Sequence, residues 1–258
     1  MSTSFTLPFN PVIWPAVPHD FTGDNNLGFS TDDTTQRFTI GTRSITWDGS
    51  VHKYVKAGSA FTSYDIGVWN QATIANRTYE AINASSPAGS RTVTINESGI
   101  TEDQFVSGRL LLFHATGGGS IYTVVGNTVS SESDTVILTL DRPLPVAISS
   151  SDSYELYASP FDDIRQGNSG NTRGFWGLPL ALLTSGSYGW IKTWGVSFIA
   201  PQSTVGNQGL AACYFRHDGS IDIRGSIGAN LVTDQYAGFR FIGSAGGDGP
   251  LMMLQVDI

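Results

Sequence analysis

Short runs in which apolar and polar residues alternate, separated by turn-forming residues, are the feature that most constrains how this chain folds. One such run covers residues 37–47, Asp48-Gly49 follows it, and a second run covers residues 51–57. Alternation places the apolar side chains on one face of a strand, and Asp-Gly between two such runs is a strong hairpin signal. The sequence therefore predicts an antiparallel β-hairpin over residues 37–57, with positive φ tolerated at both turn residues.

Similar patterns continue to the end of the chain. We expect further strands at 91–95, 109–114, 121–125, 134–140, 153–157, 188–195, 209–215 and 251–258, with less sharply bounded ones within 61–74 and 78–82. Turns are predicted at Gly117–Ser120 and Gly126-Asn127, and a long Gly- and Asn-rich loop at 162–176. Only 14% of the residues are charged, which disfavours solvent-exposed helices. We therefore expect an all-β protein, with antiparallel sandwich or barrel domains and Gly-, Ser- and Asn-rich turns.

Residues 1–36 differ from the rest of the chain. Phe5, Phe9, Trp14 and Phe21 lie among four prolines, with neither a strand nor a helix period. Proline interrupts regular pairing, and the aromatic residues make the segment too apolar for a solvated tail. We predict an extended arm that lies on a protein surface, either on its own domain or on a neighbouring subunit. These four aromatic residues are the candidate partner-contact residues.

Charge and cysteine content narrow the range of partners. Lys and Arg number 14 against 22 Asp and Glu, which gives a net charge of −8, and no basic run is available to neutralise phosphates. No apolar stretch approaches the ~20 residues needed to span a bilayer, and the first ten residues do not resemble a signal peptide. We expect neither nucleic acid nor membrane as a partner, and synthesis in a cytosol. The sole cysteine, Cys213, lies in an apolar run and is interpreted as a buried hydrophobic residue.

Four stretches, in this order, carry a resemblance to a known family. They are Phe38-Thr39-Ile40-Gly41-Thr42 with Asp48-Gly49, then residues 54–60, then the hairpin unit of residues 100–164, then residues 188–195. Together they resemble the head-decoration, or capsid-cement, proteins of tailed bacteriophages, over roughly residues 37–258. Within the hairpin unit, Gly117 to Tyr122 and Val136 to Leu140 resemble the most recognisable insert of that family.

The resemblance implies an organisation and a role. It implies a main β domain of residues 37–90 and 165–258 that carries an inserted β-hairpin subdomain of residues 91–164. It also implies a protein without catalytic activity, present in many copies on the outer surface of the phage head, where it binds the lattice of the major capsid protein. A homotrimer or a dimer would match the local symmetry of such a lattice.

Two other functions are weighed against this one. A tail-fibre or receptor-binding module that recognises host glycan would use exposed aromatic residues to stack on sugar rings. The candidates for such a surface are Trp69, Trp176, Tyr188, Trp190 and Trp194, but Trp190 and Trp194 share strand parity, and inward packing in a core is the favoured interpretation. A polysaccharide-degrading enzyme would need paired carboxylates, and no pair is distinguished among the 22 acidic residues.

No catalytic, cofactor-binding or metal-binding residue is predicted. The histidines, at positions 19, 52, 114 and 217, lack metal-ligand spacing, and His19 and His217 each precede an aspartate without forming an acid–base pair. Gly117–Ser120 lacks the lysine of a phosphate-binding loop. Asp32-Asp33 and Asp162-Asp163 are possible Ca²⁺ ligands, but solvated turn carboxylates are the favoured interpretation.

Overall fold

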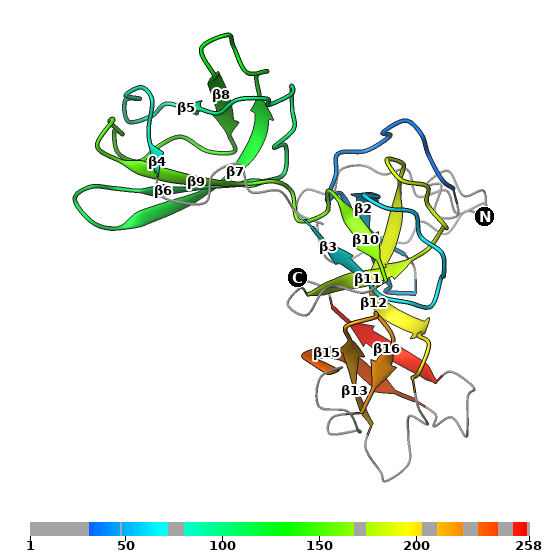
Figure 1. The fold of residues 1–258 in the computed structure, drawn as a ribbon. Coiled ribbons are helices and arrows are strands. Elements are labelled where there is room, and N and C mark those ends of the chain that lie inside the picture. Colours follow the sequence, from blue (N-terminus) through cyan, green and yellow to red (C-terminus); the bar gives the residue numbers. More distant parts are fainter. Residues whose placement is uncertain are drawn as a thin grey trace, which may run out of the picture.

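The protein is all-β, as the sequence predicts. A computed structural model describes residues 31–46, 48–71, 80–167, 174–202, 211–223, 232–241 and 250–256. These residues form sixteen strands and no helix, arranged in one ten-stranded and one six-stranded sheet. Strands pair antiparallel in both sheets, and both sheets are curled (Figure 1). One cluster of buried hydrophobic residues lies in the six-stranded sheet, and two lie among the strands of the ten-stranded sheet.

The six-stranded sheet takes all its strands from residues 80–157. They are β4 (Glu80–Ala81), β5 (Thr92–Asn96), β6 (Arg109–Phe113), β7 (Gly119–Asn127), β8 (Thr135–Leu140) and β9 (Ser153–Tyr157). Their order is β4-β9-β6-β7-β8-β5. Just after β4, Ala84 bridges Thr94 of β5, so the two ends of the order meet and the sheet curls towards a barrel. The domain boundaries expected at 91–164 stay a prediction.

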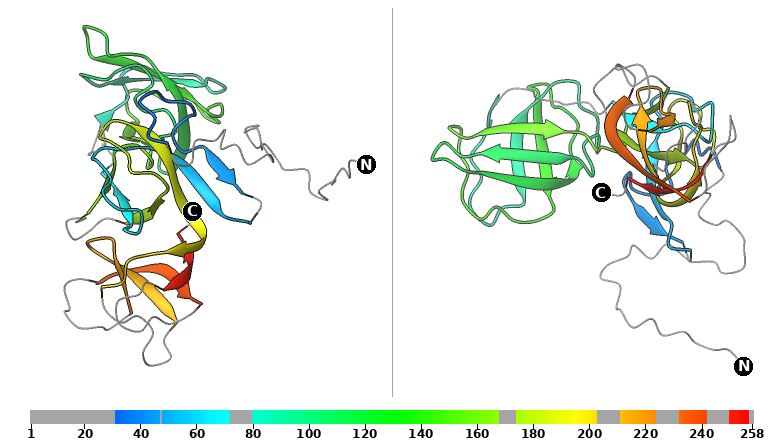
Figure 2. Two further views of the ribbon diagram at one scale, coloured as in Figure 1. Left: turned by 90° about the vertical axis from the view of Figure 1, so that its right-hand side faces the viewer. Right: turned by 90° about the horizontal axis from the view of Figure 1, so that it is seen from below.

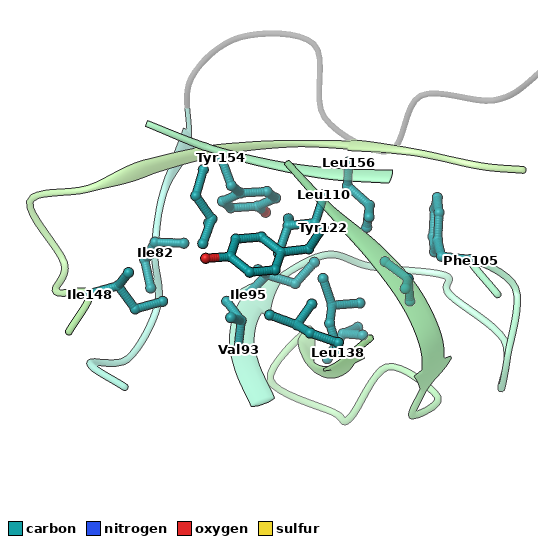
Figure 3. Packing of buried hydrophobic residues seen from close by; sticks show 14 of the residues in the cluster. Ile82, Val93, Ile95, Phe105, Leu110, Tyr122, Leu138, Ile148, Tyr154 and Leu156 are labelled. Carbon is teal, nitrogen blue, oxygen red and sulfur yellow. The ribbon is translucent and has the colours of Figure 1, made fainter. Parts of the chain in front are cut away.

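Strict alternation fills the core of this sheet. In β8, Val136, Leu138 and Leu140 are fully buried, whereas Ile137 between them is 42% exposed. Tyr122 of β7 and Tyr154 of β9 also point inward, into the same cluster as Leu138 (Figure 3). Period-2 burial of this kind is what a strand with one covered face produces.

The ten-stranded sheet is assembled from segments on both sides of the first. Its strands are β1 (Arg43–Ile45), β2 (Val51–Lys56), β3 (Val68–Asn70), β10 (Ile164–Gln166), β11 (Phe175–Pro179), β12 (Tyr188–Phe198), β13 (Ala212–Arg216), β14 (Ile221–Asp222), β15 (Val232–Arg240) and β16 (Leu251–Gln255). The main order is β10-β3-β11-β12-β16-β15-β13-β14, and β1 joins through β2, which pairs with β12. Two views show the six-stranded sheet to one side of these strands (Figure 2).

β12 connects the parts of the larger sheet. Its residues from Tyr188 to Trp194 pair with β2, and those from Trp194 to Phe198 pair with β16. A bulge lies between Lys192 and Trp194, and Gly195 follows it with φ +120°. A Cβ atom at Gly195 would overlap Ser50, so only glycine fits where the strand bends.

The first hairpin is confirmed, with a different turn from the one predicted. β1 pairs with β2 from Arg43↔Lys53 to Ile45↔Val51. Gly49 has φ +80°, but Asp48 has no positive φ and instead accepts hydrogen bonds from Thr46 Oγ1 and from the backbone N–H and Oγ of Ser50. The aspartate therefore stabilises a longer loop by side-chain bonding. Residues 37–42 lie outside β1 because the chain turns there, with Gly41 at φ +87°.

Two further predictions are wrong. The expected loop at 162–176 contains β10, and β11 begins within it, because non-local pairing with β3 holds both segments extended. Gly126-Asn127 is the end of β7 and not a turn. Buried Asn127 accepts a hydrogen bond from the Phe105 N–H and donates to the carbonyls of Thr101 and Thr128, which fixes the preceding loop on the strand.

The predicted arm falls largely outside the described residues. Phe5, Phe9, Trp14 and Phe21 all lie in the undescribed range of residues 1–30, so their contacts stay a prediction. Of the following residues, Asp33 pairs with Tyr188 at the start of β12, and Phe38 packs on Tyr54 and Trp190 with ring centroids 5.2 and 5.4 Å away. The end of the predicted arm therefore lies on its own sheet.

We predict that Leu138→Ala lowers the free energy of unfolding by about 2–5 kcal/mol, because it leaves a cavity in a closed core. Ile137→Thr, on the exposed face of the same strand, keeps a β-branched side chain and should change it by less than about 0.5 kcal/mol. Urea unfolding followed by circular dichroism measures both. Equal losses in the two variants would contradict the burial pattern of β8.

Candidate docking face

The outer side of β12, β16, β15 and β13 carries aromatic and aliphatic side chains where a soluble sheet usually carries polar ones. The set, called the apolar face below, comprises Trp194, Val196, Phe198, Ala212, Tyr214, Tyr236, Phe239, Phe241, Leu251, Met253 and Gln255. None of these residues is charged. The four strands lie together in the lower part of Figure 1.

Strand register brings these side chains side by side. Val196 and Phe198 of β12 pair with Met253 and Leu251 of β16. On the other edge of β16, Met253 pairs with Phe239, and the Phe241 N–H donates to the Leu251 carbonyl. Residues that oppose each other in a sheet point to the same face, so these pairs form two adjacent apolar rows.

Aromatic contacts extend the rows across β15 to β13. The rings of Phe239 and Phe241 are 5.5 Å apart, and those of Tyr214 and Tyr236 are 5.8 Å apart, both edge to face. A bulge at Cys213/Tyr214 changes the pairing so that Tyr214 opposes Tyr236, which keeps both tyrosines on the outer side. The apolar face is thus continuous over four strands.

The two sides of these strands differ in burial. Met252, Leu254, Cys213 and Ala237 point inward and are fully buried. Outward, Phe198 is 49% exposed and Phe241 51% exposed, and Val196, Leu251 and Tyr236 are also exposed. The fold therefore buries one side of this sheet region and leaves an equally apolar side in water.

The outer side of the six-stranded sheet provides a contrast. Its exposed aliphatic residues, such as Ile137, are mixed with polar and charged ones, and Arg109 hydrogen-bonds Thr123 across the strands. Glu155 accepts a hydrogen bond from the Tyr157 hydroxyl on the same side. Scattered apolar residues among polar ones are ordinary surface. Only the apolar face needs a special explanation among the described surfaces of the two sheets.

No family model, curated protein or solved structure matches this chain.

The aspartates considered as possible Ca²⁺ ligands have partners within the chain. Asp33 forms an ion pair with Arg37 at 2.8 Å, and Asp163 forms one with Arg165 at 2.9 Å. Asp32 accepts hydrogen bonds from the N–H and the hydroxyl of Thr184. Among the described residues, no group of three or more His, Cys, Asp or Glu side chains could hold a metal ion.

The five aromatic residues considered as an alternative sugar-binding surface do not form one exposed patch. Trp69 and Trp190 are buried, at 8% and 1% exposure. Trp176 packs on Phe161, and Tyr188 stacks on Tyr54. Trp194, expected to pack inward like Trp190, is only half buried on the apolar face, because the bulge at Lys192/Trp194 interrupts the pairing between them.

Two buried polar groups serve the structure. Cys213 is fully buried, and burial raises the pKa of its thiol to about 11, so the nucleophilic thiolate is suppressed. Arg216 and Asp222 form a buried ion pair at 3.2 Å between β13 and β14, and Asp218 lies 3.9 Å from Arg216 Nε. His217-Asp218 is thus part of a hairpin in which Asp218 accepts hydrogen bonds from the backbone N–H and the hydroxyl of Ser220.

In the described part of the chain, no helix is long and apolar enough to span a bilayer.

His52 gives the protein a predicted pH response. Burial, reinforced by the positive charge of Lys192, lowers its pKa from 6.5 to about 4. The folded state therefore holds His52 neutral where the unfolded chain already binds a proton. The free energy of unfolding therefore falls by up to about 3 kcal/mol as the pH decreases from about 6.5 towards 4, because one pKa unit corresponds to about 1.4 kcal/mol.

We expect His52→Gln to reduce the decrease in the free energy of unfolding between about pH 6.5 and pH 4. Urea unfolding at a series of pH values between 4 and 7 measures this free energy. The wild-type protein in the same buffers is the control, because every other titrating group is common to both. Parallel curves for the two proteins would show that His52 does not titrate as its burial implies.

Proposed function

We propose that this chain is a virion structural protein, a decoration or cement protein that binds the outer surface of a tailed-phage head and stabilises the shell. The observation that carries the proposal is the apolar face. On it, the strands β12, β16, β15 and β13 present uncharged, largely aromatic and aliphatic side chains, a composition typical of a protein–protein contact. A protein that acts by assembly needs such a surface.

The stretches that carry the family resemblance support the proposal by their place in the fold. Residues 54–60 begin in β2, and residues 188–195 belong to β12. Tyr54 and Trp190 are directly opposed in the pairing of these strands, with ring centroids 5.2 Å apart. The resembling stretches therefore build the central pairing of the ten-stranded sheet, which is where a shared architecture would be encoded.

The proposed partners are the lattice of the major capsid protein and further copies of this chain, as a homotrimer or a dimer. Attachment at several points gives high overall affinity from individually weak contacts, because each contact raises the effective concentration of the next. In this proposal the segment with Phe5, Phe9, Trp14 and Phe21 contacts the shell. The protein is made in the host cytoplasm, adds to the outside of the head, and uses neither a cofactor nor a catalytic residue.

We expect removal of residues 2–30 to abolish binding to phage heads while leaving the β-sheet circular-dichroism signal unchanged, because no described strand contains those residues. Co-sedimentation of the purified protein with heads that lack it measures the binding. Unchanged occupancy by the shortened chain would remove the arm from the proposal.

The location in the intact particle tests the proposal as a whole. Electron-microscopic reconstruction or antibody labelling should find copies distributed over the head surface. Copies confined to the tail tip would instead support the receptor-binding alternative, and absence from the particle would overturn both.

A further inference from the structure

We infer that the apolar face is a self-association surface, covered in solution by the same face of a second copy of this chain. The inference names the partner of the face on which the proposed function rests. Three observations carry it: the area of the face, its lack of charge and its shape.

The area suits an interface between two copies. Aromatic side chains carry roughly 150–250 Å² of surface each. Phe198, Tyr236 and Phe241 are 49%, 38% and 51% exposed, so these three leave roughly 300 Å² in water. The exposed Val196 and Leu251 and the half-buried Trp194, Tyr214, Phe239 and Met253 add to this. A standard interface buries about 800 Å² on each partner and has an apolar centre within a polar rim, so the face has the extent of such a centre.

The charge distribution selects a copy of the same chain as the occupant. In a twofold contact each residue near the axis meets its own counterpart, so any charge there would face a like charge. The chain carries a net charge of −8, and most of its surface would repel a second copy. The residues of the apolar face are uncharged. Beside the face, Asp222 opposes Tyr214 but is buried in the ion pair with Arg216, and Lys192 donates to the Val196 carbonyl at 3.0 Å.

The shape of the face also fits a copy of itself. It is formed by neighbouring strands in regular register, with side chains in rows. Two such faces pack as the inner faces of a β-sandwich do, about 10 Å apart and with interdigitating side chains. Facing sheets would give these strands, now covered on one side only, a second apolar layer.

The experiment compares the full-length wild-type chain with two single variants by light scattering after size-exclusion chromatography. Phe198→Glu places a negative charge on the apolar face, opposite a like charge in the copy. Ile137→Glu is the matched control, because Ile137 is similarly exposed, at 42% against 49%, on the outer side of the other sheet. Circular dichroism and melting temperature establish that each variant folds.

We expect a wild-type mass of twice 27.6 kDa, a monomer for Phe198→Glu, and the wild-type mass for Ile137→Glu. A monomeric wild-type protein at micromolar concentration, or a Phe198→Glu variant of unchanged mass, would overturn the inference. If Phe198→Glu does not fold, Phe241→Ser replaces it, since Phe241 lies beyond the end of β15.

The same light-scattering measurement distinguishes a second copy from other possible occupants of the apolar face. If removal of residues 2–30 also gives a monomer, the face is covered by the arm of a neighbour, and the sheet-on-sheet contact is overturned. A monomeric chain that still binds phage heads would refute the inference and leave the proposed function standing. An oligomer that never occurs on heads would support self-association of the apolar face and refute the proposed function.

Discussion

The larger sheet depends on the continuity of β12. On one edge this strand pairs with β2 from Tyr188 to Trp194, and on its other edge it pairs with β11 at Ile191 and Lys192 and then with β16 from Trp194 onward. The bend there requires Gly195, because any side chain would overlap Ser50 on the neighbouring segment. Trp194 thus pairs with Val51 on one edge and with Gln255 on the other, so β12 joins the β1–β2 hairpin to the part of the sheet that contains β16.

The same strand explains why the apolar face exists. Between Gly189 and Thr193 almost every residue of β12 is buried, on both sides of the sheet. From Val196 onward only alternate residues are buried, and Val196 and Phe198 are exposed. The chain thus encloses the first part of β12 with its own segments and covers only one side of the rest. Burial of the uncovered apolar surface is favourable by about 25 cal/mol for each Å², which gives association its driving force.

Local sequence signals predicted the strands that form locally. Asp48-Gly49 marked the first hairpin, and the alternation in residues 134–140 and 153–157 located β8 and β9 closely. β10 has no such signal, because Ile164-Arg165-Gln166 is extended only by pairing with β3, far away in the chain. The apolar face was missed for a related reason: its rows come from strands that the sequence separates, and β15 was not predicted. The apolar residues at alternate positions in 194–198 and 251–255 were visible, but alternation does not say which set is covered.

The pairing of β3 with β10 has a consequence for how this architecture varies. These two strands flank the segment that contains the six-stranded sheet, and they are hydrogen-bonded neighbours, with Asn70 opposite Ile164. Asn70 Nδ2 also donates to the Asp162 carbonyl at 2.6 Å, which ties the departing and returning chains together. Because β3 and β10 pair directly, their place in the larger sheet does not depend on the length of the segment between them. Changes in the length of the segment between β3 and β10 can therefore leave the register of these two strands as it is.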